Sequence, residues 1–125
     1  MTIQITFNEQ DQIIEVKVRE LFDWSVIETV VPQVSVFVNE KNCHRILLDF
    51  RSAHISLSTI QIYMTPEKLS DEFKKFGVEI LLLRRALLLK QNDSDYQFLE
   101  TVVLNKSQIL RIFFDETAAR EWLKA

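Results

Sequence analysis

The chain has few of the residues that loosen or cross-link a fold. Its 125 residues include one glycine, two prolines and one cysteine. The phosphate-binding loops G-x-x-x-x-G-K-[ST] and G-x-G-x-x-G each need more than one glycine, so nucleotide binding through either loop is excluded. The lone thiol of Cys43 has no partner for an internal disulfide, which fits a reducing compartment.

Long apolar runs and an excess of basic charge are also missing. No apolar stretch is longer than four residues, as at 80–83, whereas a membrane-spanning helix needs roughly 20, so we expect no stable membrane insertion. The first seven residues alternate polar and apolar side chains, unlike a signal peptide, which favours a cytoplasmic protein. The net charge of −3 argues against a general nucleic-acid binder.

The remaining composition is that of a globular protein. Hydrophobic residues make up 47% of the chain and charged residues 26%, close to the averages of folded domains. No repeat or linker divides the sequence. We therefore expect residues 1–125 to form a single domain with a hydrophobic core that needs neither a metal nor a disulfide.

The first forty residues predict a hairpin followed by a helix. Apolar and polar side chains alternate in residues 3–7 and again in residues 14–18, as in half-buried strands, with a polar turn between them. After a predicted N-cap at Asp23, apolar residues recur every three or four positions as far as Val38, which indicates an amphipathic helix. Pro32 lies inside this helix, so we expect a kink or a restart there.

Strands and helices alternate in the rest of the chain. The apolar runs at residues 46–50, 85–90 and 109–113 are typical of strands that are covered on both faces. Strands joined through helices run parallel, with right-handed crossovers. The predicted fold class is α/β, with a mixed, mostly parallel sheet of about five strands, an N-terminal hairpin and about four helices in the order ββαβαβαβα.

Capping residues mark the expected helix ends. The helix after residues 46–50 should restart at 65–67, where threonine caps and proline takes the first helical position, and should stop at Gly77. Ser94 with Gln97 forms the pattern of a capping box for the next helix, and Asp115 is expected to cap the last one.

No catalytic or metal-binding constellation is evident. Cys43 is next to His44, but adjacent side chains point apart in a turn or strand, and no third group orients the pair. His44 and His54 lie at opposite ends of one predicted strand and its loop, too far apart to share a metal unless the loop folds back. No serine has the G-x-S-x-G surroundings of a hydrolase nucleophile. We expect a protein that is not an enzyme and that binds no metal or cofactor.

Neighbouring like charges have structural explanations. Asp93 and Asp95 lie where a helix begins, and negative charge is favoured there by the free N–H groups and the helix dipole. The adjacent Arg84 and Arg85 precede a strand, and we interpret them as a sheet-edge charge pair in preference to an anion site.

The best candidate for a functional site is the polar segment between the predicted strand at 46–50 and the next helix. In open α/β sheets, ligands and partners bind beyond the carboxyl ends of parallel strands. A phosphate added to a hydroxyl at a helix start meets favourable N–H groups. The candidate junction residues are Asp49, Arg51, His54, Ser56, Ser58 and Thr59. In the structural alternative, Ser56 or Ser58 only caps the helix, and Asp49 and Arg51 pair locally.

The chain resembles STAS-type domains, the fold of anti-sigma-factor antagonists, and within them a poorly characterised SpoIIAA-like subgroup. Short motifs spread over nearly the whole chain carry the resemblance: Leu47-Leu48-Asp49-Phe50-Arg51, Ile62-Tyr63, Thr65-Pro66-Glu67, Arg85-Ala86-Leu87-Leu88, Phe98-Leu99-Glu100-Thr101, Phe114-Asp115-Glu116, and Ala119 with Trp122-Leu123. The resemblance implies a bacterial, non-catalytic regulatory module whose partner is a protein such as an anti-sigma factor, a kinase-like protein or another regulator.

The resemblance also singles out Ser58. In phosphorylatable antagonists of this family the junction carries Asp-Ser-[Ser/Thr]-Gly, and the first serine is phosphorylated. Leu57-Ser58-Thr59-Ile60 takes this place, with leucine for the aspartate and isoleucine for the glycine. The implied phosphorylation site is therefore Ser58.

Two further expectations concern ligands and self-association. Nine phenylalanines and two tryptophans leave open a carrier that holds a small apolar or anionic ligand, or a lipid, between helix and sheet. The apolar helix at residues 24–38 predicts a homodimer.

Overall fold

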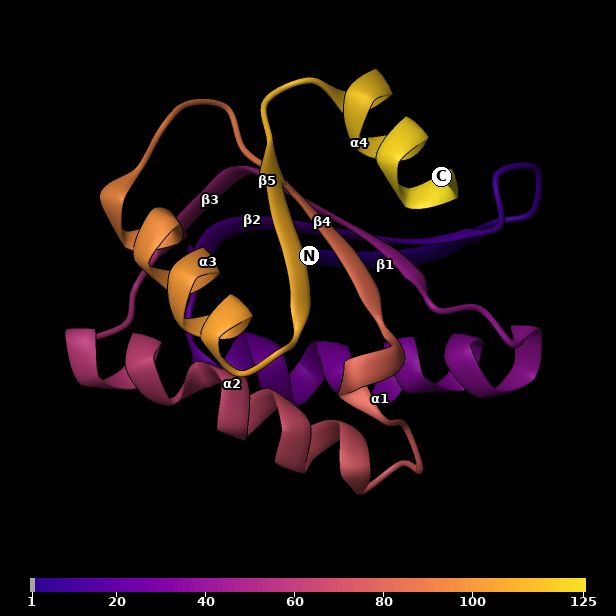
Figure 1. Cartoon of the computed structure of the whole chain (residues 1–125), viewed down its shortest axis with the longest axis horizontal. Helices are drawn as coiled ribbons and strands as arrows, with labels where there is room; N and C mark the ends of the chain where they lie inside the picture. Colours follow the sequence, from indigo (N-terminus) through magenta and orange to yellow (C-terminus); the bar gives the residue numbers. More distant parts are fainter. Residues whose placement is uncertain (1) are drawn as a thin grey trace.

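The computed structural model describes residues 2–125, which form a five-stranded sheet, four α-helices and one 3-10 helix (Figure 1). In chain order the elements are β1 (Ile3–Asn8), β2 (Ile13–Phe22), α1 (Trp24–Lys41), β3 (Arg45–Ile55), α2 (Thr59–Lys74), η1 (Ile80–Leu82), β4 (Arg84–Leu88), α3 (Ser94–Asn105), β5 (Ile109–Phe113) and α4 (Glu116–Lys124). The predicted α/β class and element order are confirmed, with η1 as an addition. None of the described helices is both long and apolar enough to cross a membrane.

The strands lie in the sheet in the order in which they occur in the sequence, β1-β2-β3-β4-β5. The β1–β2 hairpin is antiparallel, and the three later pairs are parallel because a helix returns the chain between them. The central strand, β3, is therefore flanked by β2 and β4. Residues at its carboxyl end lie where this class of sheet usually binds its ligands and partners.

Helices cover the two faces of the sheet unequally. In Figure 1, α4 lies on the opposite side of the strands from α1 and α2. Successive residues of β3 alternate between two cores: Ile46 and Phe50 pack in the core with α1, α2 and α3, whereas Leu47 packs with Ala119 and Leu123 of α4. The side chains of β3 therefore reach two separate environments within one strand.

β3 is longer than its apolar run predicts. Residues 51–55 continue the strand, and residues 52–55 pair with the end of β2, from Arg19 opposite Ser52 to Phe22 opposite Ile55. The predicted polar junction thus shrinks to residues 56–58. The register shifts between Lys17 and Arg19 of β2, and such an irregularity interrupts the two-residue period on which the sequence prediction relied.

Both helices that contain a proline continue without a restart. α1 runs through Pro32 and α2 through Pro66. Thr65 was expected to cap a new helix, but its hydroxyl donates to the carbonyl of Gln61 at 2.7 Å. The restart predicted at residues 65–67 is therefore wrong, and of the kink or restart expected at Pro32 the restart does not occur. Val31 on α1 and Ile62 on α2 belong to helix faces buried in the core, and this packing outweighs the roughly 3 kcal/mol that an internal proline costs.

Three helices begin at an aspartate. Asp23 and Asp115 accept hydrogen bonds from N–H groups in the first turns of α1 and α4, as predicted. α3 differs from its prediction, because Asp93 is its N-cap and Ser94 is already helical. The predicted capping box of Ser94 with Gln97 is wrong: the Asp93 carboxylate, one residue earlier, takes the first-turn N–H groups.

Candidate functional site

Ser58 is the N-cap of α2. Its Oγ accepts a hydrogen bond from the backbone N–H of Gln61 at 3.1 Å, and Oε1 of Gln61 accepts one from the backbone N–H of Ser58 at 3.0 Å. This is a complete capping box, and Ser58 is exposed. Ser58 therefore caps the helix, as the structural alternative expected. Its side chain is also exposed to solvent at the start of the helix.

The two neighbouring hydroxyls lie on either side of this cap. Ser56 is exposed, and its backbone N–H donates to the carbonyl of Phe22 at 2.8 Å, which continues the pairing of β2 with β3. Thr59 is exposed at the first position of α2. The first turn of α2 carries no acidic side chain, so a negative group on any of these hydroxyls would not meet a like charge within that turn.

The first turns of α2 expose apolar side chains beside Ser58. Ile60 is 71% exposed, Tyr63 61% and Met64 43%. Residues separated by three and four positions share one face of a helix, so these three side chains form a continuous surface, which we call the α2 face. The α2 face remains in contact with water while Ile62 and Phe73 of the same helix are buried in the core.

Asp49 and Arg51 form a pair on the other side of the sheet, near α4. The guanidinium of Arg51 donates to both carboxylate oxygens of Asp49, at 2.9 and 2.8 Å, and contacts Glu116 at 3.1 Å. Partial burial raises the pKa of the Asp49 carboxyl, but the hydrogen bonds and charge of Arg51 outweigh that effect and hold it below its usual value. The local pairing expected as the structural alternative is present.

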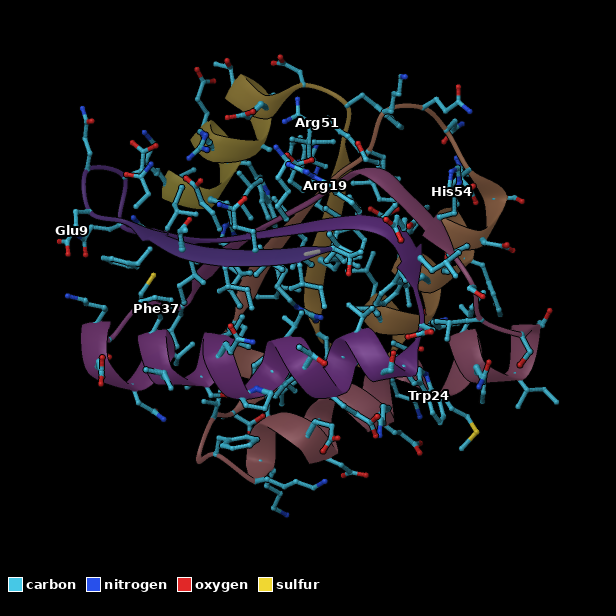
Figure 2. All side chains as sticks on the ribbon, turned by 180° about the vertical axis from the view of Figure 1, so that it is seen from behind. Glu9, Arg19, Trp24, Phe37, Arg51 and His54 are labelled. Carbon is cyan, nitrogen blue, oxygen red and sulfur yellow. The ribbon has the colours of Figure 1, made fainter. Side chains whose placement is uncertain are left out.

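The six junction residues do not form one site. Ser56, Ser58 and Thr59 surround the start of α2, whereas Asp49 and Arg51 lie near α4. His54 lies farther along β3 and borders a surface hollow of about 440 Å³, which Arg51 also borders, together with residues that include Lys90 and Asp93. Figure 2 shows Arg51 near α4 and His54 farther along β3, toward α3. The extension of β3 through residue 55 causes this separation, because an extended strand spaces its residues by roughly 3.3 Å each.

The residues tested for nucleophilic or metal chemistry also stay apart. Cys43 is buried, with Sγ 3.2 Å from the carbonyl of Gln12. His44 lies just before β3 and His54 lies near its end. Within residues 2–125, no group of three His, Cys, Asp or Glu side chains is placed to hold a metal ion.

Arg84 and Arg85 are not the sheet-edge charge pair predicted for them. β4 is an inner strand between β3 and β5, so its alternating side chains enter the two cores. Arg84 lies against Trp122 of α4, while Arg85 is only 4% exposed and its Nη2 donates to Oε1 of Gln108 at 3.2 Å. The sequence did hold a signal for this burial: Arg85 is two positions from Leu87, so a strand period of two places both on the same face.

Comparison with solved structures identifies the fold. The chain is similar to the anti-sigma factor antagonist SpoIIAA in its unphosphorylated form, with a TM-score of 0.57, 10% identity, and coverage of 98% of each chain. It is also similar to a DUF3478-family protein with a SpoIIAA-like fold from Shewanella loihica PV-4, with a TM-score of 0.55, 20% identity, and coverage of 97% of this chain and 91% of that one. No protein-family model and no curated protein matches the chain. The chain therefore has the SpoIIAA-like α/β fold that its resemblance to STAS-type domains implied.

Proposed function

We propose that residues 1–125 act as one non-catalytic protein-interaction module of the STAS/SpoIIAA-like type, which docks a regulatory protein on the α2 face. The observation that carries the proposal is the exposure of Ile60, Tyr63 and Met64 directly after the Ser58 cap. The structurally similar SpoIIAA is named as an antagonist of an anti-sigma factor, which favours a protein of that regulatory kind as the partner.

An apolar helix face suits a protein partner for energetic reasons. Each square ångström of apolar surface removed from water contributes about 25 cal/mol, and helices commonly dock by laying such a face into an apolar groove. Large side chains on the α2 face supply this surface at positions 60, 63 and 64. The partner is therefore expected to offer a hydrophobic groove with room for one aromatic ring.

Ser58 is placed to control this docking. A phosphate on its Oγ would lie at the helix N-terminus, where free N–H groups and the helix dipole favour negative charge. The same charge would lie next to Ile60, which is 71% exposed, and an apolar partner would have to desolvate it. We therefore propose that phosphorylation of Ser58 releases the partner without unfolding α2.

The docking test uses capture from cells that naturally express the protein, followed by affinity measurement with the purified partner. Ile60→Ser and Tyr63→Ser should each weaken binding at least about tenfold, as expected for apolar residues at the centre of an interface. Leu104→Ser is the matched control, because Leu104 is 51% exposed on α3 and lies outside the proposed surface. If both α2 variants bind as tightly as the wild type, the α2 face is not the docking surface.

The phosphorylation test has two parts. Mass spectrometry of the protein isolated from its own cells should find phosphate on Ser58, and Ser58→Asp should weaken the complex while Ser58→Asn does not. Asparagine and aspartate cap helices about equally well, so this comparison separates the added charge from the loss of serine. An unmodified Ser58 together with full binding by Ser58→Asp would remove the switch from the proposal.

Self-association through α1 remains a prediction. The apolar stripe that motivated it faces the core, where Val31 and Val34 are buried, and the exposed apolar residue on this helix is Val36 at 50%. Light scattering at micromolar concentration decides the matter: a monomer would contradict the predicted homodimer.

A further inference from the structure

β1 is an edge strand, and no strand within residues 2–125 pairs with its outer side. In an antiparallel pair, residues that exchange hydrogen bonds with the neighbouring strand alternate with residues that do not. The N–H of Arg19 in β2 donates to the carbonyl of Thr2 at 2.8 Å, so Thr2 and every second residue after it face β2. The N–H and C=O groups of Ile3, Ile5 and Phe7 therefore point away from the sheet.

The outer side of β1 lacks the features that usually prevent strand addition. Natural edge strands are protected by charged side chains, by proline, by a bulge or by a covering segment. Residues 2–8 contain no charged residue and no proline, and a surface hollow of about 430 Å³ is bordered by β1, β2 and Gln33 of α1. The opposite edge differs, because Glu100 of α3 accepts a hydrogen bond from the N–H of Ile112 in β5 at 2.9 Å. β1 is thus the open edge of the sheet.

The residues of β1 complement themselves in an antiparallel arrangement. When Ile5 lies opposite Ile5 of a second copy, Ile3 lies opposite Phe7, and all three outward-facing residues can exchange hydrogen bonds with their counterparts. The same register places Gln4 opposite Thr6 on the other face of the strand. Apolar side chains therefore meet apolar ones and polar side chains meet polar ones, as in stable cross-strand pairs.

The apolar side of this edge is incompletely covered in a single copy. Ile3, Ile5 and Phe7 pack against the core that contains α1, but they are only partly buried. Phe37 of α1 is partly buried too, and its ring stacks on Phe7 with the centroids 5.8 Å apart. The same side chains of a second copy would cover this surface, and the removal of apolar surface from water favours association.

The charges beside the edge match the same arrangement. On β2, Lys17 lies opposite Gln4 and Glu15 lies opposite Thr6. Because the two-fold axis at Ile5 places Gln4 of one copy opposite Thr6 of the other, the basic side chain of each copy lies in one row with the acidic side chain of its counterpart. Complementary charges of this kind fix the register of an interface and disfavour wrong partners.

We propose that β1 pairs antiparallel with β1 of a second copy of this chain, so that the two sheets join into one continuous sheet in a two-fold symmetric dimer. This is the commonest symmetry of soluble oligomers, and main-chain hydrogen bonds at a sheet edge are a recurring mode of association. The predicted homodimer thereby acquires an interface other than α1, whose apolar stripe is buried in its own core. The α2 face is on a different element and is not part of this interface.

Hydrogen exchange and light scattering of the wild type test the pairing directly. At micromolar concentration the protein should scatter light as a dimer. The amide protons of Ile3, Ile5 and Phe7 should exchange at least about tenfold more slowly in the dimer than in the diluted monomer, because they are hydrogen-bonded only across the interface. A dimer formed through α1 would leave these three amides unprotected.

A charge-swap experiment tests the register. Gln4→Lys combined with Thr6→Lys places lysine opposite lysine at both positions and should raise the dimer Kd at least about tenfold. Gln4→Glu combined with Thr6→Glu should do the same, and an equimolar mixture of the two variants should form heterodimers. Both positions are exposed. Beside them, Lys17 and Glu15 give each variant one favourable and one unfavourable neighbour, so the fold of the single chain should be little affected.

The matched control is Thr101→Lys combined with Leu104→Lys, which adds the same charge at exposed positions of α3 and should dimerise like the wild type. Three results would overturn the proposal: a monomeric wild type at micromolar concentration, a dimer in which the three amides exchange freely, or a dimer that the lysines on β1 do not weaken. Protection of these amides only after a different protein is added would also contradict it, because the edge would then belong to that protein. None of these outcomes bears on docking at the α2 face, which is tested at Ile60 and Tyr63.

Discussion

The guanidinium of Arg84 lies 3.9 Å from the centre of the Trp122 ring and donates two hydrogen bonds to the carbonyl of the same residue, at 3.1 and 2.8 Å. This contact joins the inner strand β4 to the last turn of α4. α4 has nine residues, which is too short for a helix to persist on its own. Its place on the sheet therefore depends on contacts such as this one and on the burial of Leu123.

Replacement of Arg84 should loosen α4. Arg84→Lys keeps the charge but loses the planar fork that both stacks on the ring and binds the carbonyl, and should cost about 1–2 kcal/mol of unfolding free energy. Urea unfolding followed by tryptophan fluorescence measures it. Arg19→Lys, at an exposed position of β2, is the control and should change stability by less than about 0.5 kcal/mol. Equal stability of the two variants would mean that the contact with Trp122 contributes nothing.

Ser58 should contribute to stability through its cap. Ser58→Ala removes the acceptor for the N–H of Gln61, which lies 3.1 Å away, and should lower the free energy of unfolding by about 1 kcal/mol. Ser58→Asp keeps an acceptor and should stay within about 0.5 kcal/mol of the wild type. Denaturant midpoints compare the variants. A loss in Ser58→Asp as large as that in Ser58→Ala would undermine its use as a folded mimic of phosphoserine.

Gly77 should tolerate asparagine better than alanine. Its φ is +73°, and a Cβ at this position would meet nothing within 4 Å, so a substitution there adds backbone strain without a clash. The N–H of Val78 donates to the carbonyl of Phe73 across this residue, as in a left-handed helix stop. Gly77→Ala should cost about 1–2 kcal/mol and Gly77→Asn less. The midpoints of thermal unfolding compare the two variants. If Gly77→Asn were less stable than Gly77→Ala, the space around Gly77 would matter more than its φ.

Acid should weaken the fold partly through Asp49. Arg51 holds the pKa of this carboxyl below its ordinary value in the folded state, so its stabilising effect is complete above the unfolded pKa of about 3.9 and is lost as the pH falls through the folded pKa. The stability difference between the wild type and Asp49→Asn should therefore shrink from pH 6 toward pH 2.5. Urea titrations at each pH measure it. The shrinkage should disappear in the Arg51→Met background, and its persistence there would assign the effect to another group.

Part of the site could be predicted because it depends on local sequence. A capping serine needs only the N–H groups of the next turn, and Asp49 and Arg51 are two positions apart on one strand, so short-range chemistry was sufficient for both. The exposure of the α2 face could not be predicted in this way. Ile60 and Tyr63 have the same spacing as core residues, and only the placement of α2 against α1 and α3 determines which side of the helix meets water.

The sequence by itself determined the α/β class, the order of the elements and the aspartate caps of α1 and α4, because hydrophobic period and capping act within a few residues. The tertiary structure decided the rest. Burial against the sheet carried α1 and α2 through their prolines, pairing with β2 extended β3 to Ile55, and the inner position of β4 enclosed Arg85 in the core. Each of these outcomes depends on free energy from residues distant in the chain, and a pattern read over a few positions carries no information about those partners.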